Sequence, residues 1–396
     1  MEFRDAPEEA AFRAEVRSFI EQEVDDEVRR RPGIWSSYDT GRDAGRSTKG
    51  WRKKLADRAW IAPAWPKEYG GAGMSIMQQF IFNEEMSLCR APRTGGGIAL
   101  GMAGPTIMLY GTEEQKQRLL PPILSGDQVW CQGFSEPGSG SDLASLQTRA
   151  VRDGDDYVIN GQKIWTSVAQ HAQWMILMAR TDPDAPKHKG ISYFILDMET
   201  PGITIRPLIN LLGSAGFNEV FFEDVRVPKE NLLGEENRGW YIGTTTLDFE
   251  RSMIASTTQL VLTVTDLVDW AREHIDSPQC TLTRNPGLRY ELADRAVEAQ
   301  VARLMSYRVI SMQNNGLIPN HEASVAKLYS SELEQRIALT ALKTVGLYGQ
   351  LIGDESTLSN SVARMYLYAV AVTIGGGTSE IQRNIIAMRG LGMPRE

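Results

Sequence analysis

The sequence has few cysteines, no long apolar run and no apolar signal core at its N-terminus. Cys89, Cys131 and Cys280 are its three cysteines, so at least one is unpaired, and none belongs to a C-x-x-C pair. We therefore expect reduced thiols and a cytoplasmic protein. No apolar stretch approaches the ~18 residues that a membrane span requires. The acidic N-terminus predicts an amphipathic helix, with Phe12, Val16 and Ile20 at helical spacing.

Positive charge is also scarce, since the formal net charge is −8 at pH 7 and the isoelectric point is about 5.3. Phosphate backbones are bound by basic faces, so this balance argues against a nucleic-acid partner. A small polyanionic substrate remains compatible, because one local Arg or Lys can act inside an acidic protein. The 396 residues are enough for two or three domains.

The periodicity of apolar residues changes twice along the chain. Helical spacing dominates up to about residue 125, and it returns after residue 236, with long helices predicted over 286–314, 322–346 and 356–373. Between these regions, short apolar runs alternate with turn signals at 153–156, 160–161, 182–186 and 201–202, which is typical of a compact β-barrel or sandwich. We predict an α+β protein with a helical domain (1–125), a middle β domain (126–236) and a second helical domain (237–396).

Three segments have the composition of a ligand site. They read CQGFSEPGSGSD at 131–142, GQKIWTS at 161–167 and IGGGTSEIQRN at 374–384. Glycines allow close approach of the backbone to a ligand, and a helix N-terminus favours phosphate. Taken singly, each segment also fits an ordinary structure: a serine-rich turn, a strand with a core Trp, and a capped helix.

Together, in this order and spacing, the three segments resemble the acyl-CoA dehydrogenase family. The likeness extends to WPKEYGG (65–71), YGTEEQKQRLLPPILSG (110–126), NEVFFEDVRVPKENLLGEENRGW (218–240) and ERSMIAS (250–256), so it covers essentially the whole chain. The resemblance implies a helical N-terminal domain, a middle β-barrel domain and a C-terminal four-helix bundle. It also implies FAD as cofactor, and removal of two hydrogens from the carbons beside the thioester carbonyl of an acyl-CoA.

The resemblance assigns site residues by position. The residues expected to contact FAD are Gln132, Phe134, Ser135, Ser141, Trp165, Thr166, Ser167, Lys343, Thr378 and Glu380. Those expected to contact the acyl-CoA are Ser141, Asp248, Arg251 and Gly377. Ser167 stands where the family usually has a Thr hydroxyl directed at the reactive central nitrogen of the flavin. No metal ligands are assigned.

The reaction needs a base beside the α-carbon and hydrogen bonds to the thioester oxygen as negative charge develops there. Most of the family carries this base, a Glu, directly before the Gly-Thr of the C-terminal loop, but here that position is Gly376. Isovaleryl- and long-chain-type members place the Glu on a helix before an Arg, and Glu250 precedes Arg251 in that way. We therefore expect Glu250 to be the base and the backbone N–H of Gly376 to bind the thioester oxygen. The alternative is that Glu250 merely pairs with cations on a solvated face.

Two expected anchors for the FAD of a neighbouring subunit are missing. Lys343 occupies the position of the family's Gln, and no Arg stands in register with the family's Arg, so Arg284 or Arg289 is a candidate substitute. The chain is therefore either a homotetramer that binds the adenine end differently or one subunit of a heterotetramer with a sister chain. A catalytically inactive subunit and an acyl-CoA oxidase are further alternatives. An electron-transfer flavoprotein is the expected acceptor, and the glycine at 376 favours a branched or bulky acyl group.

Overall fold

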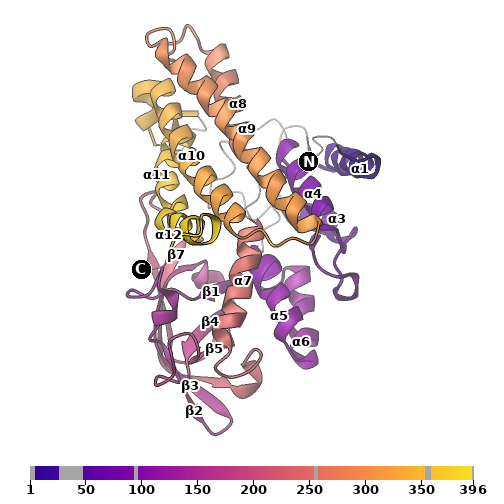
Figure 1. The fold of residues 1–396 in the computed structure, drawn as a ribbon, viewed down its shortest axis with the longest axis vertical. Coiled ribbons are helices and arrows are strands. Elements are labelled where there is room, and N and C mark those ends of the chain that lie inside the picture. Colours follow the sequence, from indigo (N-terminus) through magenta and orange to yellow (C-terminus); the bar gives the residue numbers. More distant parts are fainter. Residues whose placement is uncertain (1–4, 26–47, 93–96, 254–256, 353–357, 395–396) are drawn as a thin grey trace. The chain divides into compact units, whose positions relative to one another are not determined.

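The computed structural model describes residues 5–25, 48–92, 97–253, 257–352 and 358–394, with side chains omitted at 48–49, 248–253 and 358–360. Its contacts divide the chain into two compact units. The first comprises Met1–Arg58, Gly73–Thr94 and Ile254–Glu396, and the second comprises Ala59–Ala72 and Gly95–Met253. Helices precede and follow the strands (Figure 1), which confirms the predicted α+β order.

The second unit contains the sheet. In the described part of the chain it has seven strands in the order β1-β4-β2-β3-β7-β6, with β5 paired to β4. The strands are β1 (Trp130–Gly133), β2 (Arg149–Asp153), β3 (Asp156–Ser167), β4 (Trp174–Arg180), β5 (Ile191–Asp197), β6 (Ile203–Leu208) and β7 (Phe217–Pro228). The buried face of the sheet is aliphatic and aromatic, with Ile159, Leu177, Phe194 and Val220 all fully buried.

Two irregularities interrupt the pairing of β3 with β7, at Ile159/Gly161 and at Lys163/Thr166. The predicted turn at Asn160-Gly161 is wrong, because both residues lie inside β3. Asn160 instead bonds across to β7, with its amide donating to the Asp224 carboxylate at 3.0 Å. The other three turn signals do separate successive strands.

Hydroxyl groups fix the helix that leaves the sheet, α7 (Gly239–Met253). Its Thr246 is fully buried, and its hydroxyl oxygen lies 3.0 Å from that of Thr106 on α5 (Gly104–Tyr110) and 3.2 Å from that of Tyr193 on β5. A second pair joins Thr245 to Tyr110 at 2.9 Å. Because a buried hydroxyl without a partner costs free energy, these contacts specify how α7 is rotated about its axis.

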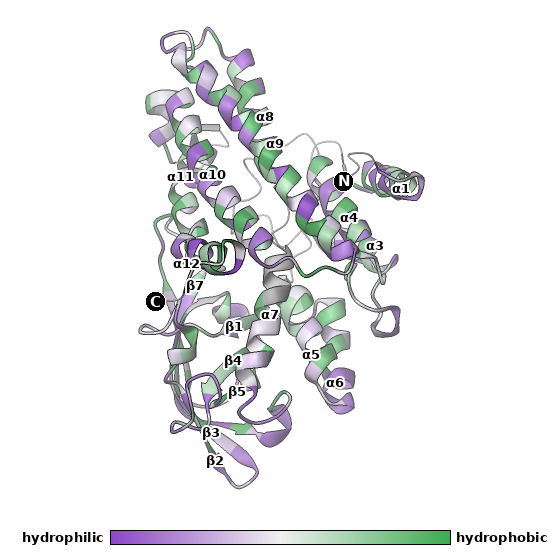
Figure 2. Ribbon diagram, in the orientation of Figure 1, coloured by the Kyte–Doolittle hydropathy of each residue, from purple (hydrophilic) through white to green (hydrophobic). Residues whose placement is uncertain are grey.

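The first unit is helical. It contains α1 (Pro7–Glu23), α3 (Thr48–Ala56), α4 (Ile76–Leu88), α8 (Thr258–Glu273), α9 (Gly287–Asn314), α10 (His321–Val345), α11 (Leu358–Val372) and α12 (Ser379–Ile385). The second unit adds α6 (Glu113–Ser125), a 3-10 helix at Lys67–Tyr69 and a π-helix at Ala99–Ala103. Helices α9 and α10 run side by side (Figure 1), and hydrophobic and hydrophilic residues alternate along both (Figure 2). The three long helices predicted near the C-terminus are confirmed, and within the described residues no helix has the length and apolarity of a membrane span.

A buried group of charges joins α1, α4 and α9 within the first unit. Glu84 is 1% exposed and accepts hydrogen bonds from Arg13 (2.6 Å), Arg303 (2.8 Å) and Tyr307 (2.9 Å). Its neighbour Glu85 is also buried and pairs with Arg13 at 2.9 Å. Breaking a buried ion pair from one side leaves the remaining charge without compensation, which costs about 3–5 kcal/mol.

We predict that Glu84→Ala lowers the free energy of unfolding by about 3–5 kcal/mol, because Arg303 and Tyr307 lose their buried acceptor. Denaturant unfolding followed by circular dichroism measures this change. The control is Glu15→Ala, which removes an exposed pair with Arg58 and should cost less than about 1 kcal/mol. Equal effects of the two substitutions would contradict the prediction.

Candidate active site

The first two predicted segments meet on the sheet. The backbone N–H of Ile164 in β3 donates to the carbonyl of Ser135 at 2.9 Å, and Phe134 is buried with its ring edge-on to Tyr193. Gln132, in β1 opposite Ile176, is half-buried. The structure therefore brings Ser135 beside the strand that carries Trp165.

A buried ion pair fastens these two segments. The ammonium of Lys163 is fully buried and donates to the Glu136 carboxylate at 2.8 Å and to the carbonyl of Phe134 at 2.9 Å. Glu136 also accepts from the backbone N–H groups of Gln147 (2.6 Å) and Thr148 (2.9 Å). The carboxylate is thus satisfied on both oxygens, and the loop that follows β1 is held to β3 by charge-assisted bonds.

Burial and charge act in opposite directions on this pair. Burial lowers the pKa of Lys163 to about 8, although the adjacent carboxylate of Glu136 raises it. Burial alone would raise the pKa of Glu136, but the Lys163 ammonium and the backbone donors outweigh it, so that pKa lies below its ordinary value. Both groups are therefore charged near neutral pH.

Trp165 has an unusual backbone and an exposed ring. It lies where β3 carries an extra residue relative to β7, its φ is +60°, and its side chain is 60% exposed, with one edge against Phe217. A bulky residue at positive φ is strained and is found where the surrounding structure enforces it. Next to it, Thr166 is buried, and its hydroxyl has no hydrogen-bond partner among the described residues, while Ser167 is half-buried.

Ser141 lies at the surface near a pair of opposite charges. Its neighbour Asp142 accepts two hydrogen bonds from Lys187, at 2.8 and 2.9 Å, and both side chains are at least half exposed. The Lys187 ammonium holds the pKa of Asp142 below its ordinary value. The ammonium of Lys187, in the loop before β5, is therefore already paired with the residue that follows Ser141.

The glycine-loop residues belong to the first unit. Gly376 and Gly377 have φ values of +66° and +93°, which glycine adopts without strain. Their carbonyl oxygens both accept from the Gln382 side chain at 3.3 Å. In the part of the chain that the structure describes, the backbone N–H of Gly376 has no acceptor. The loop thus keeps an N–H group available for a ligand.

Thr378 and Glu380 follow this loop at the start of α12. The Thr378 hydroxyl caps the helix by accepting from the N–H of Ile381 at 3.2 Å. Both residues line a pocket of about 570 Å³, together with Gln335, Arg336 and Arg383. The hydroxyl of the intervening Ser379 is buried without a partner among the described residues.

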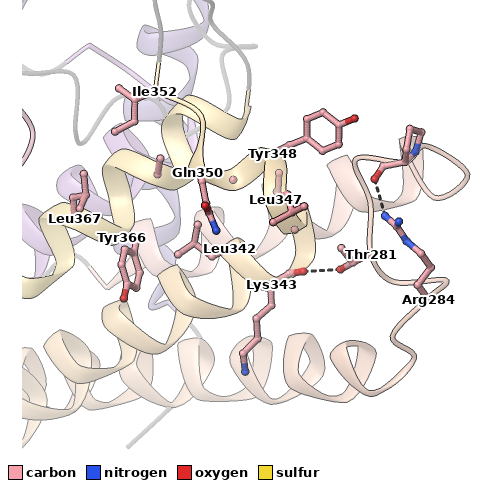
Figure 3. A pocket seen from close by; sticks show the side chains of 15 residues that line it. Thr281, Arg284, Leu342, Lys343, Leu347, Tyr348, Gln350, Ile352, Tyr366 and Leu367 are labelled. Atoms are coloured by element: carbon pink, nitrogen blue, oxygen red, sulfur yellow. Dashed lines mark hydrogen bonds between the residues drawn. The ribbon is translucent and has the colours of Figure 1, made fainter.

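Lys343 and Arg284 line one larger pocket, of about 850 Å³, whose other walls include Leu342, Tyr348 and Tyr366. Figure 3 shows Lys343 extended away from these apolar side chains, and its ammonium bonds Glu291 on α9 at 3.0 Å. Arg284 donates to the carbonyl of Pro278 at 2.7 Å. Arg289, the other candidate, is not among the pocket's lining residues.

The remaining predicted residues, Asp248, Glu250 and Arg251, lie on α7, and their side chains are outside the described residues. The helix itself runs through these positions. Ile242, two turns before Glu250, is 2% exposed, and Thr246, one turn before it, is 0% exposed. In an α-helix, residues four apart share a face, so helical spacing relates position 250 to Thr246.

Comparison of the chain with known proteins identifies its family. Residues 6–127, 131–225 and 237–391 match the models of the acyl-CoA dehydrogenase N-terminal, middle and C-terminal domains. The acyl-CoA dehydrogenase IpdE1 of Mycobacterium tuberculosis (strain ATCC 25618 / H37Rv) is 36% identical over 389 residues, which cover 97% of this chain and 98% of that protein. The chain belongs to the acyl-CoA dehydrogenase family.

Solved structures agree with this acyl-CoA dehydrogenase assignment. The Tcur3481-Tcur3483 steroid ACAD matches with a TM-score of 0.86 at 35% identity, with 100% of each chain covered. A chain of the ChsE4-ChsE5 complex from Mycobacterium tuberculosis matches with a TM-score of 0.83, also at 35% identity and with 100% of each chain covered. These matches confirm the predicted fold class and the predicted oxidoreductase class. Members of the family are generally FAD-dependent.

Sequence reasoning missed the buried lysines of this acyl-CoA dehydrogenase. Lys163 and Glu136 each lie inside a segment that was singled out, and their opposite charges in mostly uncharged segments were the available signal. Lys327, on α10, donates to the carbonyl of Gly377 at 2.8 Å, but it stands 50 residues before that glycine and no local pattern marks it.

We predict that Lys163→Met lowers the free energy of unfolding by about 3–5 kcal/mol at pH 7, because Glu136 is left buried and charged without its cation. Since the folded-state pKa of Glu136 is depressed, its contribution is complete above the ordinary value of ~4.3 and is lost as the pH falls through the lower folded value. The difference from the unsubstituted protein should therefore shrink below about pH 4.

Denaturant titrations from about pH 2.5 to about pH 8, which extend below the ordinary pKa of a Glu, measure this dependence. Lys229→Met, which removes an exposed pair with Asp155, is the matched control and should change stability by less than about 1 kcal/mol at every pH. A pH-independent loss for Lys163→Met would show that packing, and not the charge of Glu136, accounts for the effect.

Proposed function

We propose that this acyl-CoA dehydrogenase binds FAD and converts an acyl-CoA thioester to the 2-enoyl-CoA, with Glu250 as the base. The carboxylate of Glu250 takes the α-proton, and the N–H of Gly376 donates to the thioester oxygen as that oxygen gains negative charge. When bound, FAD supplies the acceptor for the hydride that leaves the β-carbon. Asp248 and Arg251 are proposed to contact the CoA portion of the substrate.

The proposal that Glu250 is the base is supported by the glycine at position 376 and by the packing of α7. Position 376 has no side chain, so the glycine loop cannot provide a carboxylate. Helical spacing relates position 250 to Thr246, which is buried and held by hydroxyl contacts to Thr106 and Tyr193. We propose that the Glu250 carboxylate, one turn further along the helix, takes its direction from this fixed stretch, as general-base catalysis requires.

The residues on the sheet fit an isoalloxazine ring. Trp165 presents an exposed aromatic surface from a strained backbone, and strain of this kind is concentrated at ligand sites. Thr166 keeps a hydroxyl without a partner, and Ser167 adds a second hydroxyl. We propose that Phe134, Ser135 and Trp165 pack against the flavin, with Gln132, Thr166 and Ser167 around its polar edge. Ser141 is placed between the flavin phosphates and the CoA.

A branched or bulky acyl group, such as a steroid side chain, is the proposed substrate class. Gly376 and Gly377 leave this part of the loop without side chains, and one of the solved relatives named above is called a steroid ACAD. Anaerobic titration with a panel of acyl-CoAs, followed by the flavin absorbance, tests this. A strict preference for short straight chains would contradict it.

Glu250→Gln is predicted to reduce the rate of flavin bleaching by an acyl-CoA at least 10³-fold, on the order expected for loss of an essential base, while FAD stays bound. Stopped-flow absorbance under anaerobic conditions measures the rate. Asp248→Asn is the comparison: it lies about 200° around the same helix and should mainly raise KM for the acyl-CoA. Full activity in Glu250→Gln would exclude the proposed base.

We propose that Arg284 and Lys343 contact the adenine end of the FAD of a neighbouring subunit, and that Thr378 and Glu380 also contact FAD. Arg284 is preferred over Arg289 because it shares a pocket with Lys343. Two of the solved relatives are named as complexes of two proteins, so a heterotetramer with a sister chain is proposed beside the homotetramer. An electron-transfer flavoprotein is the proposed electron acceptor.

Arg284→Ala is predicted to lower the FAD content of the purified protein, whereas Arg289→Ala should leave it unchanged. The loss of one charge-assisted phosphate contact corresponds to about 10-fold weaker binding or more. FAD content is measured from the absorbance of protein purified alone. If the unsubstituted chain is already empty and a co-expressed homologue restores FAD, the heterotetramer is correct and the homotetramer is wrong.

A further inference from the structure

The loop between α11 and α12 contains three consecutive glycines, Gly375, Gly376 and Gly377. Glycine has more backbone freedom than any other residue, so a run of three cannot hold a single conformation by local preference. A hydrogen-bond donor is useful in catalysis only if it is oriented before the reaction begins. Rigidity in this loop must therefore come from contacts with other elements.

Lys327, which belongs to the first unit, makes such contacts. It lies on α10, is 7% exposed, and its ammonium donates to the carbonyl of Gly377 at 2.8 Å and to that of Val372 at 3.2 Å. Val372 is the last residue of α11, and Gly377 is the last glycine of the loop. A single ammonium thus joins the two ends of the segment that contains Gly376.

A second set of hydrogen bonds to the glycine loop is weaker. Gln382 on α12 donates to the carbonyls of Gly376 and Gly377, both at 3.3 Å, which is long for a hydrogen bond. Its amide is neutral, whereas hydrogen bonds from an ammonium are roughly twice as strong. Burial lowers the pKa of Lys327, while Glu332 raises it. Because the bond from Lys327 to Gly377 is shorter and comes from an ammonium, it holds the loop more strongly than the bonds from Gln382.

These contacts bind the carbonyl groups of the loop and leave the N–H group of Gly376 without an acceptor among the described residues. The carbonyls of Gly376 and Gly377 are turned toward Gln382 and Lys327, whereas the N–H of Gly376 has no acceptor within the described residues. A loop held in this way presents donors, and not acceptors, to a ligand. That polarity suits an oxygen that gains negative charge.

We propose that Lys327 is a positioning residue, which fixes the glycine loop so that the N–H of Gly376 is aimed at the thioester oxygen before substrate binds. This inference rests on the proposed function for the identity of the ligand. The contacts that orient the loop belong to the protein alone and are present without it.

Hydrogen exchange on the ligand-free protein tests the positioning directly. In Lys327→Met, backbone amides of peptides covering residues 373–381 should exchange at least about 10-fold faster, because the loop opens more often. In Lys327→Gln, whose amide is neutral and shorter than the lysine side chain, the increase should be intermediate. Ser331→Ala, one turn along α10 and also buried, is the matched control and should leave the exchange of the loop unchanged.

Turnover and spectroscopy show whether positioning matters for the reaction. For Lys327→Met we expect kcat to fall about 10- to 100-fold, with a smaller change in KM, as for a misplaced oxyanion donor. In a Glu250→Gln background, where acyl-CoA binds without reacting, isotope-edited infrared spectra report the thioester C=O stretch. The shift to lower frequency caused by the bound N–H should be lost on adding Lys327→Met.

The outcomes separate this inference from the proposed function. If Lys327→Met fails to fold, the Gln variant carries the test. Loop exchange, kcat and carbonyl frequency that all match those of the unsubstituted protein would overturn the role of Lys327, even with Glu250→Gln inactive. Conversely, full activity of Glu250→Gln would refute the base, while faster exchange in Lys327→Met would still show that this lysine holds the loop.

Discussion

The buried pairing of Lys163 with Glu136 is the constraint on which the sheet side of the site depends. One ammonium and one carboxylate, both withdrawn from water, are stable only together, and each also bonds the backbone of the loop that follows β1. The loop therefore cannot move away from β3 without exposing an uncompensated charge. The aromatic surface of Trp165 and the carbonyl of Ser135 are held in one arrangement as a result.

Two lysines serve the same physical purpose in the two units. Lys163 ties one ligand-binding segment to the sheet, and Lys327 ties the glycine loop to α10. In both cases a buried ammonium donates to a main-chain carbonyl, so it fixes the backbone whatever side chains the loop carries. The chemistry proposed for Glu250 then needs only the direction of α7, which buried hydroxyls specify.

The helices, the order of the domains' secondary structure and the three segments could be predicted from the sequence, because periodicity and glycine-rich loops are local signals. The environment of Trp165 could not. Strict alternation from the buried Tyr157 and Ile159 would place Trp165 inside and Thr166 outside, but the extra residue in β3 reverses this order. A bulge depends on the partner strand, and Lys327 depends on a contact 50 residues away, so neither leaves a local pattern.

The ion pair between Lys343 and Glu291 has a consequence for the larger pocket. The ammonium that joins α10 to α9 is also the one proposed to contact a phosphate of FAD. A phosphate and the carboxylate of Glu291 must compete for it, so filling the pocket trades one electrostatic contact for another. Under the proposed role of Lys343, occupancy of the pocket is thereby coupled to one of the contacts between α9 and α10, the ion pair of Lys343 with Glu291.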